Sequence, residues 1–340
     1  MNLTVNQQPI YFDEATPTVA AFLHARKIPE KAIVVAINGD IIARSDWESV
    51  RFKENDIVEI VRAVSGGDHD FVESAVTSDT FIIAGETFTS RLFLGTGKYS
   101  DNLTMSAALD ISGTEMVTVA IRYMNLDTLT GDGSSLLDEL DLTRYRLLPN
   151  TAGAYTVTDA VKMARLARAV TNTNWIKLEV IGDKKTLWPD VAATIEATRI
   201  LVKEGFVVLP YTSPDLVAAQ RLEQAGAATV MPLASPIGSG QGMQDWKSIE
   251  RIIGAVSVPV VVDAGIGVPS DAALAMELGA SAVLVNTAVA KAHDPVRMAL
   301  GMRRGVEAGR LAWIAGRIAR TDHANASSPT AGVPIATVIE

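Results

Sequence analysis

Short apolar segments recur along most of this chain, and a stretch with helical spacing follows each of them. Between about residue 81 and residue 310 they return at intervals of about 20 to 30 residues, as expected for repeated β–α units. Eight of them predict β-strands, at residues 92–94, 116–119, 145–148, 176–181, 207–209, 228–231, 258–262 and 282–285. Eight such units predict an α/β fold in which parallel strands close into a (β/α)8 TIM barrel.

An open doubly wound sheet is the alternative, because it is built from the same β–α units. Periodicity alone does not separate the two folds. The helical spacing at residues 159–170 and the helix start at Pro269, Ser270 and Asp271 fit both. The number of units favours the closed barrel.

Residues 1–67 have the pattern of a small separate domain. Apolar spacing predicts four strands and one helix in the order ββαββ. The first strand falls at residues 3–5, and the second follows a polar turn at residues 6–8. The helix falls near residues 18–27, and the last two strands fall at residues 32–37 and 57–61. This order fits a β-grasp (ubiquitin-like) domain, which ends at Gly66 and Gly67.

The remaining chain is expected to have three parts. Residues 68–80 hold acidic residues from Asp68 to Asp79 among small residues, which predicts a solvated acidic linker. The barrel is expected over residues 81–320. Residues 321–340 are then a C-terminal tail.

The composition excludes several classes of function. The 340 residues include no cysteine, which excludes disulfides, thiolate metal sites and a cysteine nucleophile. The net charge of −9 argues against nucleic-acid binding as the main role. Without an apolar run of about 18 residues or a secretion signal, no membrane partner is expected, and we place the protein in the cytoplasm. The four histidines lack ligand spacing, so no metal and no other cofactor is predicted.

The predicted strand at residues 176–181 contains two ionisable residues, Lys177 and Glu179. Alternate residues of a strand share one face, so the amine should lie beside the carboxylate. Burial among apolar neighbours predicts a lysine that loses its proton easily and is nucleophilic, which suits an imine with a sugar ketone. Glu179 can then move protons. The alternative is an internal ion pair that only neutralises itself.

Distinctive segments follow five of the predicted strands, where barrels of this kind have their active sites. They are Gly95-Thr96-Gly97-Lys98, Pro149-Asn150-Thr151-Ala152-Gly153, residues 235–242, Asp263-Ala264-Gly265-Ile266-Gly267 and Asn286-Thr287. Glycine lets backbone N–H groups approach an anion, and the loops after the seventh and eighth strands commonly hold a phosphate. A phosphorylated substrate is therefore predicted, although the glycines of any one loop also suit ordinary tight turns.

Two further residues compete for chemical roles. Asp263 follows five apolar residues, which predicts a poorly hydrated carboxyl group that acts as a second acid or base. Its alternative role is to cap the turn at Ala264 and Gly265. Lys98 is a rival nucleophile, but its loop is expected to be exposed, so Lys177 is preferred.

These segments closely resemble the thiazole synthase family of thiamin biosynthesis, from about residue 81 to residue 332. The resemblance rests on residues 94–99, 148–153, 177–180, 235–242, 262–267 and 285–288, which read LGTGKY, LPNTAG, KLEV, SPIGSGQG, VDAGIG and VNTA. Residues 1–67 resemble the sulfur-carrier protein of the same pathway, a ubiquitin-like protein whose terminal glycine becomes a thiocarboxylate. The chain is thus identified as a carrier–synthase fusion.

The resemblance implies a role for each of the predicted site residues. The lysine matching Lys177 forms an imine with 1-deoxy-D-xylulose 5-phosphate, and the carboxylates matching Glu179 and Asp263 take part in the proton shifts. The residues implied to contact the sugar phosphate are Gly238, Ala264, Gly265, Asn286 and Thr287.

The resemblance also implies partners. Sulfur comes from the carrier thiocarboxylate, and dehydroglycine supplies nitrogen and carbon to complete a thiazole phosphate carboxylate. An adenylating (E1-like) enzyme activates the carrier. The family pattern is a homo-oligomer, with a tetramer suggested, and its C-terminal segment, matched here by residues 326–329, is expected to cover the pocket.

The fusion departs from the carrier pattern at Gly67, because a peptide bond to Asp68 leaves no free carboxylate to activate. Our hypothesis is that a protease cuts after Gly67. Alternatively, the tethered domain docks permanently and another donor supplies sulfur. Two other interpretations of the whole chain remain open: a phosphosugar-binding scaffold or adaptor with an inactive carrier domain, and a plain Schiff-base aldolase.

Overall fold

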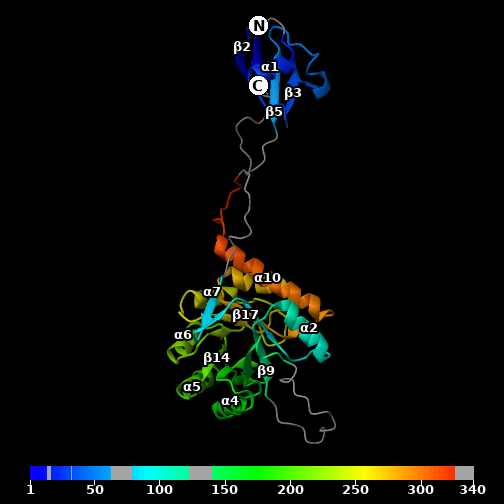
Figure 1. Ribbon diagram of the computed structural model, residues 1–340. Coiled ribbons are helices and arrows are strands. Elements are labelled where there is room, and N and C mark those ends of the chain that lie inside the picture. The colour runs from blue at the N-terminus through cyan, green and yellow to red at the C-terminus, as the bar shows by residue number, and fades with distance from the viewer. Residues whose placement is uncertain (14–16, 32, 63–78, 122–139, 326–340) are drawn as a thin grey trace. The chain divides into compact units, whose positions relative to one another are not determined.

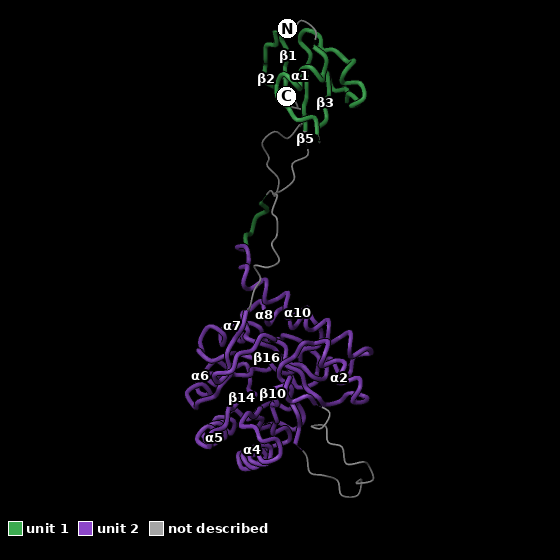
Figure 2. Tube along the Cα trace, in the orientation of Figure 1, with its two compact units in different colours: residues 1–75, 320–340 green, residues 76–319 purple. Residues whose placement is uncertain are grey.

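The computed structural model describes residues 1–13, 17–31, 33–62, 79–121 and 140–325. The chain divides into two compact units, Met1–Ala75 with Arg320–Glu340, and Val76–Ala319 (Figure 2). Most of the predicted linker, Gly66, Gly67 and residues 326–340 of the predicted tail lie outside the described residues.

The N-terminal unit is a five-stranded mixed sheet with one helix packed against it (Figure 1). Its elements are β1 (Asn2–Val5), β2 (Gln8–Tyr11), α1 (Val19–Ala25), β3 (Ile33–Ile37), β4 (Asp40–Ile42), a short 3-10 helix (Arg44–Asp46) and β5 (Ile57–Arg62). The sheet order is β2-β1-β5-β3-β4, and β1 and β5 form its parallel pair. Phe22 and Leu23 of α1 are buried in one core with Leu3, Val35 and Val58. The predicted β-grasp fold is confirmed.

One strand of this unit is absent from the prediction. β4 is only three residues long, and its Ile41 is exposed, so it shows no clear apolar alternation. It pairs with β3 through a two-residue turn at Asn38 and Gly39, which both have positive φ angles. Asn-Gly is the usual signal of such a hairpin, so the sequence did contain the information.

The second unit contains eight parallel strands that close into a barrel, as predicted. They are β8 (Leu92–Gly95), β9 (Met116–Ala120), β10 (Arg146–Asn150), β11 (Trp175–Leu178), β14 (Val207–Thr212), β15 (Met231–Pro232), β16 (Val261–Asp263) and β17 (Ala282–Val285). Their order, β15-β14-β11-β10-β9-β8-β17-β16, is chain order wrapped into a ring. Parallel bridges from Val230 to Val260 and from Leu233 to Asp263 join the two ends. An open doubly wound sheet lacks this closure.

Helices pack outside the strands (Figure 1). They are α2 (Asn102–Ser112), α4 (Val157–Thr171), α5 (Val191–Lys203), α6 (Leu216–Gln224), α7 (Trp246–Ile253), α8 (Pro269–Glu277), α9 (Thr287–Ala290) and α10 (Pro295–Ala315). Six begin at a residue whose side chain accepts a backbone N–H three positions later: Asp101, Thr156, Asp190, Asp215, Asp245 and Asp294. These caps satisfy N–H groups that the helices leave unpaired.

The barrel interior is apolar at its amino-terminal end. Residues from the first positions of several strands form one buried cluster there, including Met116, Trp175, Val261 and Ala282. A hairpin of β6 (Phe81–Ile83) and β7 (Glu86–Phe88) adds Ile83 and Phe88 to that cluster. This end is therefore filled, which leaves the carboxyl-terminal end for a site.

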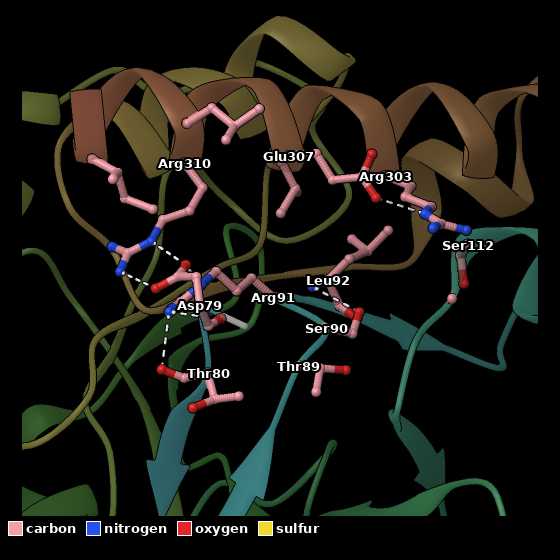
Figure 3. Close-up of a pocket in the computed structure, with 14 residues that line it drawn as sticks. Asp79, Thr80, Thr89, Ser90, Arg91, Leu92, Ser112, Arg303, Glu307 and Arg310 are labelled. Carbon is pink, nitrogen blue, oxygen red and sulfur yellow. Dashed lines mark hydrogen bonds and ion pairs between the residues drawn. The ribbon is translucent and has the colours of Figure 1, made fainter. Parts of the chain in front are cut away.

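Asp79 was expected in a solvated linker, but the structure binds it to the amino-terminal end of the barrel (Figure 3). Its carboxylate accepts hydrogen bonds from Arg91, directly before β8, and from Arg310 of α10 at 2.5 and 2.7 Å. The Arg91 side chain is 6% exposed and also donates to Ser281 O. The Arg310 hydrogen bond is the main reason why the pKa of Asp79 falls to about 2, with Arg91 adding to the effect.

We predict that Asp79→Asn lowers the free energy of unfolding by roughly 1–2 kcal/mol at pH 7, because it leaves the buried Arg91 without its counter-ion. The expected loss in the free energy of unfolding is smaller than for a fully buried ion pair, because a third of the Asp79 side chain is exposed to solvent. The folded pKa is below the ordinary value, so the stabilisation is complete above about pH 4 and is lost as the pH falls towards 2.

Denaturant unfolding of both proteins from pH 3 to 7 measures this difference. Glu307→Gln is the control, since its pair with Arg303 is about half exposed and should contribute under about 1 kcal/mol. Equal losses in the two variants would contradict the prediction.

Candidate active site

The carboxyl-terminal end of the barrel contains a cavity of about 570 Å³. Its wall includes every predicted site residue of the barrel: Lys177, Glu179, Asp263, Gly238, Ala264, Gly265, Asn286 and Thr287. They come from the ends of β11, β15, β16 and β17, which are far apart in sequence. Closure of the strands into a ring is what brings them together.

Lys177 lies at the base of this cavity between two carboxylates. Its Nζ is 2.5 Å from Asp263 Oδ2 and 3.6 Å from Glu179 Oε1, and the three side chains are 8%, 3% and 7% exposed. On β11, Lys177 comes two residues after the buried Trp175. On β16, Asp263 comes two residues after the buried Val261. Each strand thus presents an apolar residue low in the barrel and an ionisable one near its mouth.

The structure corrects the predicted protonation of Lys177. Burial is the largest single influence and lowers the pKa of the amine, but the charges and hydrogen bonds of Asp263 and Glu179 together outweigh it. The pKa of Lys177 is therefore above its ordinary value, and the resting amine is protonated. The prediction of an easily lost proton was wrong because it counted burial and omitted Asp263, which only the fold brings within contact.

The predicted strand at residues 176–181 is also shorter than expected. β11 ends at Leu178, and the chain turns into a hairpin of β12 (Ile181–Asp183) and β13 (Trp188–Pro189). Glu179 lies in the connection between β11 and β12, and its carboxylate remains on the same side as the Lys177 amine. The buried Val180 and Ile181 gave the appearance of a continuous strand.

Asp263 caps the turn, as one of its two predicted roles required, and also contacts Lys177. Its Oδ1 accepts the N–H of Ala264 at 2.8 Å, which braces a turn where Ala264 and Gly265 have positive φ angles. Its Oδ2 faces Lys177. Turn capping therefore orients the carboxylate rather than replacing its contact with the amine.

Two loops of the site approach so closely that glycine is required. A Cβ on Gly265 would lie 1.9 Å from Ser235 Oγ, and one on Gly267 would lie 2.5 Å from Gly240 O. Ser235 donates to Gly265 O at 3.1 Å. The loops after β15 and β16 therefore form one interlocked wall of the cavity.

The loop after β8 adds a cationic group that the sequence suggested only as a rival nucleophile. Lys98 is exposed, as expected, and its Nζ is 3.4 Å from Thr287 Oγ1. It lies 3.5 Å from where a Cβ on Gly238 would be. Asn286, with its amide turned to suit its neighbours, donates to Gly97 O at 2.8 Å and so braces this loop. Lys98, Gly238 and Thr287 thus converge from three loops.

Three residues at or near the cavity could not be found from sequence. Tyr155 and Leu187 line the cavity, and the ring of the buried Tyr211 lies 6.0 Å from Lys177 Nζ. Burial, reinforced by the charges of Asp263 and Glu179, raises the pKa of Tyr211, so its phenol stays neutral. None of the three lies in a pattern that distinguishes it from an ordinary loop or strand residue.

The described residues contain no group of three or more histidine, aspartate or glutamate side chains placed to bind a metal ion. Nor does any helix among them have the length and apolar character to span a membrane.

Comparison with known proteins assigns both units. The family model "Thiazole biosynthesis protein ThiG" matches residues 82–329, and the ThiS family model matches residues 3–67. Thiazole synthase of Myxococcus xanthus is 56% identical over 259 residues, which cover 76% of this chain and 98% of that protein. Thiazole synthase of Paramagnetospirillum magneticum is 44% identical over 335 residues, or 98% of this chain and 100% of that one.

A solved structure agrees with these matches. A chain in the crystal structure of the Amycolatopsis orientalis BexX/CysO complex is 35% identical, with a TM-score of 0.64, and the match covers 71% of this chain and 98% of that one. The model of the first family covers most of the barrel unit and more than half of the whole sequence. This chain therefore belongs to the thiazole synthase (ThiG) family and has a ThiS-family domain ahead of its barrel.

Proposed function

We propose that this chain is the thiazole synthase of thiamin biosynthesis and condenses 1-deoxy-D-xylulose 5-phosphate, dehydroglycine and thiocarboxylate sulfur into a thiazole phosphate carboxylate. Family membership supports the overall activity. The observation that supports the chemistry is the amine of Lys177, buried between Asp263 and Glu179 in the cavity. A covalent lysine intermediate needs such a nucleophile with proton acceptors in contact.

Imine formation starts from a protonated lysine, so the first step is a proton transfer. Asp263, at 2.5 Å, takes the proton as the substrate enters, and the neutral amine adds to the C2 ketone. The resulting hydroxyl leaves as water when the proton returns to it. The products of this step are one imine and one water molecule.

Glu179 then acts on the carbon next to the imine. Removal of the C3 proton moves the C–H electron pair into a C2–C3 double bond, while the imine π electrons move to nitrogen. Reprotonation shifts the carbonyl along the sugar, which prepares it to accept sulfur. Glu179 is close enough to the lysine nitrogen to serve this carbon, since Oε1 lies 3.6 Å from Nζ.

The phosphate group would lie where the loops after β8, β15, β16 and β17 line the cavity. Gly238, Ala264, Gly265, Asn286 and Thr287 line this part of the cavity, with Lys98 as the cation. An ammonium group is well suited to a phosphate, and this chain is otherwise acidic.

Sulfur would come from the ThiS-family domain after activation by an adenylating enzyme. This requires a free Gly67 carboxylate, and we propose that a protease cuts after Gly67. The ThiS-family match ends at Gly67, which supports this position for the cut. The cytoplasmic location and the homo-oligomer stay predictions.

Borohydride trapping tests the proposal and separates it from the scaffold interpretation. Incubation with 1-deoxy-D-xylulose 5-phosphate and reductant should add one reduced sugar phosphate to the peptide that contains Lys177. Lys177→Arg keeps the charge but should trap nothing and lose on the order of 10³-fold or more in turnover. Lys162→Ala, an exposed lysine of α4, is the control. A trapped adduct in the arginine variant would disprove the assignment.

The phosphate contact of Lys98 has its own prediction. Lys98→Ala should raise the KM for the phosphosugar about tenfold, since a charge-assisted hydrogen bond contributes about 1.5–3 kcal/mol and Lys98 is open to water. The yield of trapped imine at saturating substrate should not change. Lys291→Ala, outside the cavity at the end of α9, should leave the KM unchanged. Equal KM values in the two variants would remove Lys98 from the phosphate site.

Cleavage is tested by the intact mass of the protein isolated from its native host during thiazole synthesis. We expect one species that ends at Gly67 and one that begins at Asp68. Full-length chain alone would exclude the cut and favour a tethered domain with another sulfur donor.

A further inference from the structure

The loop after β10 contains a buried threonine whose hydroxyl group contacts the backbone of Glu179. Thr151 is 0% exposed. Its Oγ1 donates to Glu179 O at 2.7 Å and accepts the N–H of Glu179 at 2.8 Å. One hydroxyl group therefore satisfies both backbone polar groups of a residue 28 positions away.

This contact lies where the regular hydrogen bonding of the barrel stops. Asn150 is the β10 residue that pairs with Lys177, and the next N–H, that of Thr151, donates to Lys177 O at 3.1 Å. Beyond Glu179, Ile181 N donates to Ala154 O and Val180 O accepts from Asp190 N. Glu179 and Val180 thus lie between the barrel ladder and the hairpin, and the Thr151 side chain takes the place of a strand partner for Glu179.

We propose that Thr151 is a positioning residue, whose hydroxyl group holds the Glu179 backbone and so sets the distance between the Glu179 carboxylate and the Lys177 amine. The inference rests on the proposed function, since it concerns the carboxylate that moves protons next to the imine. Proton transfer depends steeply on placement, and an error of about 1 Å can cost on the order of 100-fold in rate.

A purely structural role is the competing explanation, because a buried backbone N–H and C=O that lose their partner destabilise any protein. Thr198 offers a matched comparison. It is also 0% exposed, and its Oγ1 donates to Thr194 O at 2.7 Å within α5. Thr198 does not line the cavity.

The test follows proton exchange in D₂O at the carbons next to the C2 carbonyl of 1-deoxy-D-xylulose 5-phosphate, by NMR with the full chain. This exchange reports carbon deprotonation and needs no sulfur donor. Borohydride trapping on the same samples reports the imine separately. The variants are Thr151→Val, which removes the hydroxyl at nearly constant volume, Thr151→Ser, which keeps it, and Thr198→Val.

We expect the exchange rate of Thr151→Val at saturating substrate to fall by about 10- to 100-fold, with KM and the yield of trapped imine within about threefold of wild type. Thr151→Ser should exchange within about threefold of wild type, and Thr198→Val should lose stability without loss of exchange. Exchange in Thr151→Val within threefold of wild type, or equal losses in the serine and valine variants, would overturn the inference.

Two further outcomes separate a failure of this inference from a folding defect and from a failure of the proposed function. If Thr151→Val does not fold, the serine variant decides: near wild-type exchange supports the role of the hydroxyl group, and a loss above tenfold overturns it. If the wild-type protein traps no imine at Lys177, the proposed function itself fails, and the inference fails with it.

Discussion

The site depends on one ion-pair cluster inside the barrel, formed by the ammonium group of Lys177 and the carboxylates of Asp263 and Glu179. Removing one such charge from water costs several kcal/mol, and an unpaired lysine at this depth would lose its proton. The two carboxylates reverse that tendency and keep the amine charged at rest. In the proposed mechanism, a substrate that displaces this pairing would release the nucleophile.

The barrel makes this cluster possible by separating its two ends. Apolar side chains and the β6–β7 hairpin fill the amino-terminal end, so water reaches the interior from the mouth. At the mouth, the loops after β15 and β16 contact through glycines that have no room for a side chain. A rigid wall of this kind holds Asp263 and the cavity lining in place, which a covalent mechanism requires.

Much of this architecture could be predicted. Eight apolar runs favoured the barrel, because each strand repeats one local pattern that does not depend on distant contacts, but the bridges from Val230 to Val260 and from Leu233 to Asp263 were needed to exclude an open sheet. The pairing of Lys177 with Glu179 followed from the alternation of side chains along a strand. The end of β11 at Leu178 could not be predicted in this way, since buried apolar residues continue past it and only the contact with Thr151 and the following hairpin shows that the strand has ended.

The sequence by itself determined the two-part organisation, the repeated β–α units and the residue types at the strand ends, because helix and strand periods, turn residues and capping side chains act over a few positions. Only the tertiary structure decided which of those residues meet. Asp263 reaches Lys177, Lys98 reaches Thr287, and Thr151 reaches Glu179 across separations of 28 to 189 residues. The physical reason is that electrostatic interaction and hydrogen bonding depend on distance in space, so the charge state of Lys177 was set by a neighbour that no local pattern places beside it.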